Sequence, residues 1–252
     1  MTITWRDGGG VFNVHARLLD SGIKGLVADI VPAGVEVAES TCDVSSGVTE
    51  RELESLGWAV AARRAEFVTG RALAREALSA VGAPATDLVR TATGAPAWPQ
   101  GFTGSITHCS GYRAAAVAAR RDVRALGIDA EPHRPLANEL VAAIATLGER
   151  HGWPVAPGLW PETVAFSAKE AACKALYGLG AGLLDFAQLH IELRGLHRLG
   201  EGAWHGTFDA QLHRARREPG LPAGVAGRWL VSDSLVLTAV VLEAAAGTGR
   251  CA

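Results

Sequence analysis

Two acidic residues, Asp129 and Glu131, stand one residue apart in the apolar stretch LGIDAEP. Successive side chains of a β-strand point to opposite faces, so both carboxylates would lie on the same face. Two neighbouring carboxylates repel each other unless a cation lies between them. Mg²⁺ suits such a pair, because it takes one or two carboxylates and completes its shell with water and substrate phosphates. A solvated strand edge is the commoner reason for such a pair, so the pair alone has low specificity.

A third acid lies in the stretch FSAKEAACKAL, where Glu170 and Lys174 are four residues apart and Lys169 precedes Glu170. Residues four apart share one face of a helix, and surface pairs of this kind are common and weak. Alanine and leucine surround these three residues, however, which favours a packed helix with one functional polar stripe.

The stretch GSITHCS places His108 beside hydroxyl-bearing residues such as Thr107. An imidazole near hydroxyls and amides could bind a phosphate, and a histidine satisfied by local hydrogen bonds is an equally good interpretation. Cys109 could be read as a nucleophile that uses His108 as its base. Adjacent residues seldom face each other, so the sequence gives this interpretation little weight.

The stretch ARRAEFVTGRALAREAL contains four arginines, Arg63, Arg64, Arg71 and Arg75. At about 100° per residue, Arg64, Arg71 and Arg75 fall within one helical stripe. A solvated basic face is the default interpretation. A row of guanidinium groups is also what a multiply phosphorylated ligand requires.

The elements that must position these residues form two similar sets. A helical pattern covers residues 50–80 and ends near Gly82, and a second helix opens at Pro161 and ends at Gly178. Short strands and loops are expected in residues 1–50, and two strands joined by a turn at Arg121 and Asp122 in residues 112–131. Further strands are expected at 186–193, at 203–208 and in a hairpin at 227–242 that turns around Ser232 and Asp233. Each half then combines a long helix with a small antiparallel sheet, an α+β arrangement.

Composition narrows the classes of protein. The 252 residues are 48% hydrophobic and 20% charged, and their net charge of −2 gives no case for a nucleic-acid-binding protein. No apolar run reaches membrane-spanning length, and the first residues lack the order of a signal peptide. The four cysteines, Cys42, Cys109, Cys173 and Cys251, form no CxxC pair, which predicts a reduced, cytoplasmic protein.

Three stretches, GAPAWPQGFTGSITHC, LGIDAEP and FSAKEAACKALYG, together resemble the signature motifs of the Sfp-type 4′-phosphopantetheinyl transferases, in particular their enterobactin synthase component D-like branch. The resemblance implies two similar α+β halves, residues 1–125 and 126–252, related by a pseudo-twofold axis. Coenzyme A would bind in the cleft between them. Its phosphopantetheine arm would pass to a serine of an apo acyl, peptidyl or aryl carrier protein of polyketide or nonribosomal peptide biosynthesis, and adenosine 3′,5′-bisphosphate would leave.

The resemblance also implies roles for individual residues. Glu170 would accept the serine proton, and Lys174 would stabilise the transferred phosphoryl group. Mg²⁺, or Mn²⁺ in its place, would be held by Asp129, Ala130, Glu131 and Glu170. The coenzyme A-binding residues would be Arg63, Arg71, Arg90, Gly94, Pro96, Thr107, His108, Asp129, Lys169, Glu170 and Lys174. Helical phase favours Arg64 over Arg63 as the neighbour of Arg71, so which of them meets the 3′-phosphate stays open.

We therefore expect a cytoplasmic, monomeric, magnesium-dependent transferase that binds neither nucleic acid nor membranes. One alternative is a coenzyme A-dependent acyltransferase that uses Cys109 and His108. The other is a non-catalytic module that binds coenzyme A or docks carrier proteins.

Overall fold

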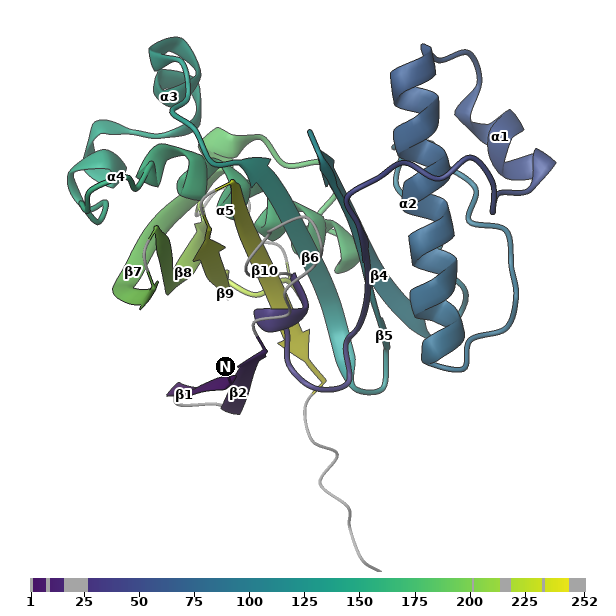
Figure 1. Cartoon of the computed structure of the whole chain (residues 1–252), viewed down its shortest axis with the longest axis horizontal. Coiled ribbons are helices and arrows are strands. Elements are labelled where there is room, and N and C mark those ends of the chain that lie inside the picture. The colour runs from purple at the N-terminus through teal and green to yellow at the C-terminus, as the bar shows by residue number, and fades with distance from the viewer. Residues whose placement is uncertain are drawn as a thin grey trace, which may run out of the picture.

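The computed structural model describes residues 2–7, 10–15, 27–200, 202–213, 219–232 and 234–244. Two long helices lie against antiparallel sheets (Figure 1), so the predicted α+β class is confirmed. A separate two-stranded ribbon, β1 (Thr2–Asp7) with β2 (Gly10–His15), precedes the 3₁₀ turn η1 (Val27–Asp29). No helix in the described ranges is long and apolar enough to cross a membrane.

The N-terminal part is built on a three-stranded sheet in the order β3 (Glu36–Ser40), β5 (Tyr112–Ala119), β4 (Phe102–Cys109). Helix α2 (Ala61–Ala80) packs on this sheet, and the short helix α1 (Glu50–Leu56) precedes it. The helical stretch predicted at residues 50–80 is interrupted at 57–60, between α1 and α2, but its predicted end is confirmed. Gly82 has a φ of +72°, and the N–H of Ala83 donates to the carbonyl of Leu78 at 2.9 Å, which closes the last turn.

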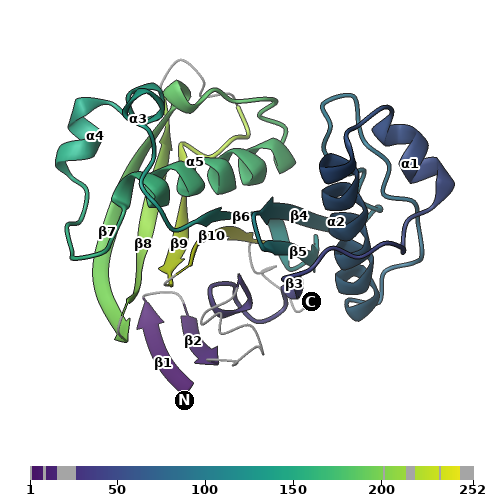
Figure 2. The same ribbon diagram turned by 45° about the horizontal axis from the view of Figure 1, so that its top comes forward.

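The C-terminal part is a five-stranded sheet in the order β6 (Val123–Pro132), β10 (Leu235–Glu243), β9 (Gly224–Val231), β8 (Ala203–Leu212), β7 (Leu189–Gly200). Helix α5 (Pro161–Gly178) lies across one face of this sheet (Figure 2). Its inward face is largely alanine, which lets the helix approach the strands closely. A Cβ at Gly127 of β6 would lie 2.0 Å from the carbonyl oxygen of Ala171, so glycine is required where α5 rests on β6.

The two sheets meet where β4 runs beside β6. The predicted turn at Arg121 and Asp122 does join β5 to β6. Strand β6, however, belongs to the other sheet, where it pairs with β10. Its free edge is satisfied by hydroxyl groups of β4. Ser105 Oγ accepts from the N–H of Ile128, and Thr107 Oγ1 accepts from the N–H of Ala130, both at 3.0 Å. The predicted boundary between residues 125 and 126 falls inside β6, so the division into halves stays a prediction.

Two short helices between β6 and α5 were not predicted, α3 (Asn138–Ile144) and α4 (Leu147–His151). The strand expected at 186–193 begins instead with the 3₁₀ turn η2 (Phe186–Gln188) and continues as β7. Asp233 of the expected hairpin turn and Cys251 lie outside the described residues. Cys42, Cys109 and Cys173 are free thiols.

Candidate active site

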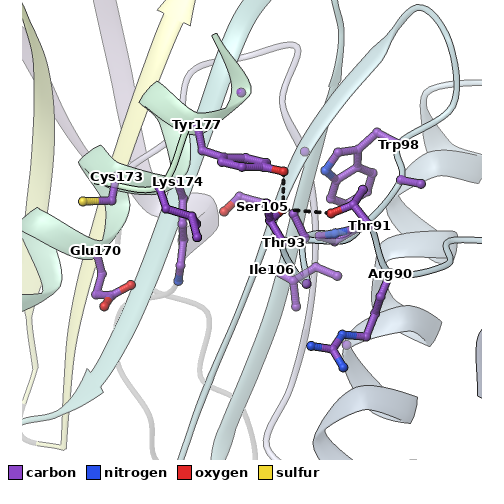
Figure 3. A pocket seen from close by; sticks show the side chains of 18 of the residues that line it. Arg90, Thr91, Thr93, Trp98, Ser105, Ile106, Glu170, Cys173, Lys174 and Tyr177 are labelled. Carbon is purple, nitrogen blue, oxygen red and sulfur yellow. Dashed lines mark hydrogen bonds between the residues drawn. The ribbon is translucent and has the colours of Figure 1, made fainter. Parts of the chain in front are cut away.

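A cleft of about 1210 Å³ lies between the two parts of the molecule. One wall comes from α2, from the loop at residues 90–98 and from β4. The opposite wall comes from α5 and the glycine-rich loop that follows it. Figure 3 shows these walls facing each other, with Arg90 on one side and the side chains of Glu170 and Lys174 on the other. The cleft therefore brings together predicted residues of the arginine-rich helix, of the loop at 90–98, of β4 and of α5, whereas Asp129 and Glu131 do not line it.

Arg71 is the most deeply held cation of the cleft. Its side chain is 5% exposed, its Nε donates to the carbonyl of Leu88 at 2.6 Å, and its guanidinium lies 4.5 Å from the centre of the Phe67 ring. Burial lowers the pKa of Arg71 to about 10, with Glu52 opposing the shift, so the group stays charged at neutral pH. A fixed, partly desolvated guanidinium of this kind is suited to binding a phosphate.

Arg63, and not Arg64, accompanies Arg71 in the cleft. The Nη1 of Arg63 lies 2.8 Å from Nε2 of His108 and 3.2 Å from Glu66. Because arginine has only donors, Nε2 of His108 must accept, which leaves the ring proton on Nδ1. Burial lowers the pKa of His108, the charge of Glu66 opposes this and that of Arg63 adds to it. His108 is therefore a neutral imidazole, and Arg63 supplies the positive charge.

Arg75 belongs to the scaffold and not to the cleft. Its Nη2 pairs with Glu52 at 2.6 Å, and its other nitrogens donate to the carbonyls of Gly47 and Thr86. The stripe of three arginines predicted from helical phase is thus divided: Arg71 lines the cleft, Arg75 bonds to the scaffold, and Arg64 is exposed outside the cleft. Helical phase fixes the direction of each Cβ, whereas the conformation of the long arginine side chain decides where the guanidinium group lies.

The loop at residues 90–98 is a tight turn built around Arg90. Gly94 has a φ of +89°, so the backbone favours glycine, and a Cβ there would lie 2.9 Å from Nη2 of Arg90 and would displace its guanidinium. Pro96 lies opposite Arg90 in an isolated bridge. At the tip, the hydroxyl of Thr93 bonds to those of Thr91 and of Tyr177 on α5, which links the two walls (Figure 3).

The other wall is a stripe of α5 residues spaced by three and four, namely Glu170, Cys173, Lys174 and Tyr177. Glu170 is the predicted catalytic base. Burial raises the pKa of Glu170, with Lys174 opposing the rise and the charge of Asp129 adding to it. A carboxylate whose pKa is raised toward neutrality is a better general base than an exposed one.

Asp129 lies behind this stripe and is only 4% exposed. Its Oδ1 accepts from Nζ of Lys174 at 2.7 Å and from Thr107 Oγ1 at 3.2 Å, and its Oδ2 accepts from Ser167 Oγ at 2.9 Å. Ser167 Oγ also lies 2.9 Å from the hydroxyl of Thr238 on β10. Sequence reasoning missed Ser167 and Thr238. The position of Ser167 one turn before Glu170, among alanines, was the available signal.

Glu131, two residues further along β6, is half-buried. Burial raises the pKa of Glu131 to about 7, and the charge of Asp129 adds to the rise while Lys174 opposes it. The charge of Glu170 also raises the pKa of Glu131, and whether the three carboxylates share a metal ion stays a prediction. In the described part of the chain, no three His, Cys, Asp or Glu side chains are gathered into a metal-binding group.

A divalent ion that keeps water and substrate phosphates in its shell needs only one or two of these carboxylates. The oxygen Oδ1 of Asp129 already carries a cationic partner, the ammonium of Lys174. Oxygen donors beside an ammonium group are consistent with a site for Mg²⁺. The donor set thus fits the predicted ion, although the structure does not arrange all its predicted members around one point.

Three predicted residues have other surroundings. Lys169 is 1% exposed and turns away from the cleft, where its Nζ pairs with Glu149 at 3.0 Å and donates to the carbonyls of Phe186 and Leu189. This placement does not fit the prediction that Lys169 binds coenzyme A. The hydroxyl of Thr107 donates to Asp129 and accepts from the N–H of Ala130. Thr107 and Ala130 therefore lie behind the cleft and do not line it.

Cys109 lacks the surroundings of a nucleophile. It does not line the cleft, it packs against the hydrophobic core, and its Sγ donates to the carbonyl of Ser110 at 3.8 Å. Burial raises the pKa of the Cys109 thiol to about 12, with the charges of Glu131 and Asp129 adding to the rise. Because the thiolate is the reactive form, this cysteine is unsuited to the acyltransferase alternative.

Comparison with known proteins places this geometry in context. Residues 51–118 match the 4′-phosphopantetheinyl transferase N-terminal domain, and residues 125–226 match the 4′-phosphopantetheinyl transferase superfamily. The chain is 38% identical over 226 residues to the 4′-phosphopantetheinyl transferase PptT of Mycobacterium tuberculosis, covering 86% of this chain and 98% of that protein. It is 36% identical over 222 residues to Npt of Nocardia iowensis, covering 85% of this chain and 99% of Npt. Enterobactin synthase component D of Salmonella typhimurium is 37% identical over 122 residues, 45% of this chain and 48% of its own length.

Proposed function

The chain belongs to the 4′-phosphopantetheinyl transferase superfamily and is an enzyme that transfers phosphopantetheine from coenzyme A to carrier proteins, and we propose that it does so with Mg²⁺ and onto a serine hydroxyl. The single observation that carries the proposal is the composition of the cleft. Basic groups fixed on one wall face a carboxylate and lysine stripe on the other, within a cavity of about 1210 Å³. A polyanionic donor and a nucleophile that must lose a proton require these two sets.

The N-terminal wall would bind the phosphates of coenzyme A. Arg71 is fixed by Leu88 and Phe67, and Arg63 and Arg90 line the same wall, so the three guanidinium groups suit the 3′-phosphate and its neighbourhood. Neutral His108 would donate through its Nδ1–H to a pyrophosphate oxygen. Gly94 and Pro96 would shape the loop beside the adenosine. Between Arg63 and Arg64, we propose Arg63, because only Arg63 lines the cleft.

The C-terminal wall would perform the transfer. The serine oxygen of the carrier attacks the phosphorus that bears the pantetheine arm, and its proton passes to Glu170, directly or through a water. The bond from this phosphorus to the bridging oxygen breaks, and adenosine 3′,5′-bisphosphate leaves with the electron pair. Lys174, one turn from Glu170, would stabilise the charge on the transferred group.

Asp129 and Glu131 would hold Mg²⁺, with Glu170 as a further ligand. When bound, the ion would neutralise charge on the pyrophosphate and on the leaving group. Asp129 is prepared for this role by Thr107 and Ser167, which fix the orientation of its carboxylate. Ala130 would contribute through its backbone, whose N–H is held by Thr107.

The remaining features of the proposal concern the molecule as a whole. We place the cleft between two halves, residues 1–125 and 126–252, and expect the chain to act as a cytoplasmic monomer. Light scattering at catalytic concentration tests the monomer, since a mass of twice 26.2 kDa would contradict it. Separate expression of the two residue ranges tests the boundary, which cuts through β6.

The decisive experiment incubates the enzyme with coenzyme A, Mg²⁺ and a panel of apo acyl, peptidyl and aryl carrier proteins. We expect the mass of at least one carrier to rise by one phosphopantetheine group. The rise should vanish when the carrier serine is replaced by alanine or when a chelator is added. Transfer that persists in the chelator would refute the Mg²⁺ requirement, and an acyl adduct on Cys109 would favour the acyltransferase.

A further inference from the structure

The two oxygens of the Asp129 carboxylate have different neighbours. Oδ2 accepts from Ser167 Oγ, and Ser167 and Thr238 are both fully buried. Thr238 in turn donates to the carbonyl of Ser167 at 2.9 Å. Water cannot replace these hydroxyls without entering the core, so removing Oδ2 from them would leave buried polar groups unpaired. Oδ2 is therefore committed to the interior.

Oδ1 accepts from the buried hydroxyl of Thr107 at 3.2 Å and also has an exchangeable neighbour. The ammonium of Lys174 lies 2.7 Å away, and its other acceptor is the carbonyl of Ile128 at 3.1 Å. The side chain of Lys174 is 30% exposed and lines the cleft, whereas that of Asp129 is 6% exposed. A flexible lysine at the edge of a cleft can turn toward another anion at little cost, and the buried aspartate cannot follow it.

We propose that Lys174 is the resident counterion of Asp129 in the free enzyme, and that a divalent cation must displace it from Oδ1 to bind. Oδ2 is committed, so Asp129 offers a cation one oxygen, and that oxygen is the one that Lys174 holds. Displacement would release the ammonium toward the phosphates of coenzyme A, where the proposed function needs it. This inference rests on the metal site of the proposed function.

Two consequences distinguish this arrangement from a lysine that merely lies near the metal. In the absence of coenzyme A, Lys174 and a divalent cation compete, so removing the ammonium should strengthen metal binding. In its presence, the phosphates offer Lys174 another partner, so the competition should weaken. If Lys174 were not the counterion of Asp129, its removal would change the dissociation constant of the metal only as much as the removal of any nearby positive charge.

The test measures Mn²⁺ binding to the coenzyme A-free protein by electron paramagnetic resonance, at fixed pH and ionic strength. We expect Lys174→Met to lower the Mn²⁺ dissociation constant about tenfold relative to the wild type, because binding no longer breaks a charge-assisted hydrogen bond. Lys174→Arg, which keeps the charge, should show a smaller gain. Adding coenzyme A should reduce the difference between wild type and Lys174→Met.

Arg134→Met serves as the matched control. Arg134 is exposed, and its charge acts on Glu131, but it forms no hydrogen bond or ion pair with Asp129 in the described contacts. Its removal should change the dissociation constant far less than Lys174→Met. Equal effects of the two variants, unchanged affinity in Lys174→Met, or absence of Mn²⁺ binding in both proteins would each overturn the inference.

A transfer assay on the wild type keeps the two proposals separate. Mg²⁺-dependent transfer together with unchanged Mn²⁺ affinity in Lys174→Met would leave the proposed function intact and refute the counterion role. Transfer that ignores a chelator would refute the metal site itself. The thermal midpoint of Lys174→Met, measured in parallel, shows that the variant is folded.

Discussion

Each of the two parts of the molecule contains a short α-helix that opens with a threonine–glutamate capping box. Helix α1 begins with Thr49 and carries Glu52 three residues later, and α4 begins with Thr146 and carries Glu149. In both, the threonine and glutamate form a capping box, in which each side chain bonds to the other residue's backbone N–H. The two helices are far apart in the chain and begin in the same way.

The shared device extends into the cores. Glu52 accepts from the N–H of Leu88 at 2.6 Å and pairs with Arg75 of the long helix α2. Glu149 accepts from the N–H of Ile191 at 2.9 Å and pairs with Lys169 of the long helix α5. In each part, a buried carboxylate ties a short helix, a strand or loop, and the long helix together.

What differs between the two parts is the face that the long helix turns toward the cleft. Helix α2 presents Arg63 and Arg71, and α5 presents Glu170 and Lys174 in front of Asp129. The interior charges repeat because they solve the same packing problem. The cleft charges diverge because, on our proposal, one wall binds phosphates and the other performs chemistry. Substitutions of the interior pairs should therefore lower stability, and substitutions in the cleft should lower turnover or the affinity for coenzyme A.

Lys169→Met should have the largest effect on stability. It leaves the carboxylate of Glu149 buried without its cation, and breaking a buried ion pair in this way costs about 3–5 kcal/mol. We expect the midpoint of urea unfolding to fall accordingly, with an unchanged dependence on urea concentration. Lys174→Met, on another face of the same helix, should cost less, because Lys174 is 30% exposed and Asp129 keeps the hydrogen bonds from Thr107 and Ser167.

A double-mutant cycle sharpens this prediction. Lys169→Met combined with Glu149→Gln removes both charges, so the double variant should regain part of the lost stability. Additive losses in the cycle would show that Lys169 and Glu149 do not act as a pair.

In the other part, Arg75→Met should cost less than Lys169→Met, because the side chain of Arg75 is 31% exposed and that of Lys169 is 1% exposed.

Glu170→Gln should have the largest effect on catalysis. The substitution keeps the shape of the side chain and removes its basicity, so turnover should fall at least about a hundredfold, the usual scale for a general base. Stability should stay the same or rise, since burial already disfavours the charged form of Glu170. Steady-state kinetics at saturating coenzyme A and carrier measures the turnover.

Loss of a metal ligand could imitate loss of the base. The assay must therefore be repeated across pH and at increasing Mg²⁺ concentrations. Recovery of wild-type turnover at high Mg²⁺ would show that Glu170 is only a ligand and that the serine proton leaves by another route.

Arg71→Ala should affect binding rather than turnover. A charge-assisted contact with phosphate is worth about 1.5–3 kcal/mol, so the KM for coenzyme A should rise about ten- to a hundredfold. The effect should largely disappear with 3′-dephospho-coenzyme A as the donor. The same increase with both donors would contradict the assignment of Arg71 to the 3′-phosphate.

The sequence predicted the long helices well because their ends carry local signals. Gly82 and Pro161 mark an end and a beginning that the backbone itself requires. The alanine-rich face of α5 likewise predicted close packing. Helices α3 and α4 escaped prediction because they are short, although the spacing of Thr146 and Glu149 was a readable capping signal.

The site was predictable as a set of motifs but not as a set of contacts. Lys169 and Lys174 are both basic neighbours of Glu170 in sequence, and only the fold shows that Glu149 captures one of them and Asp129 the other. Partners that lie far apart in the chain leave no periodic signal. For the same reason, the position of Ser167 marked it as unusual, but its contacts with Asp129 and Thr238 could not be foreseen.

The smallest expected effect concerns Glu131, two residues after Asp129 on β6. Its pKa is raised to about 7, above its usual value of 4.5, chiefly by burial and then by Asp129. Folding therefore favours the protonated form, so this contribution to stability is complete below about pH 4.5 and is lost as the pH rises through 7. Glu131→Gln stays neutral at every pH, so it should gain stability over the wild type between pH 5 and pH 8.

Because the side chain is partly exposed, we expect a gain of only about 1 kcal/mol at pH 8, or roughly 2–4 °C in the thermal midpoint, and almost none near pH 4.5. The measurement is made in a chelator and then with Mg²⁺. A cation held by Asp129 and Glu131 would stabilise the charged carboxylate of Glu131, so the advantage of the variant should shrink when Mg²⁺ is added. A gain that is the same at every pH would mean that Glu131 is not strained by its charge, and a gain that ignores Mg²⁺ would place the ion elsewhere.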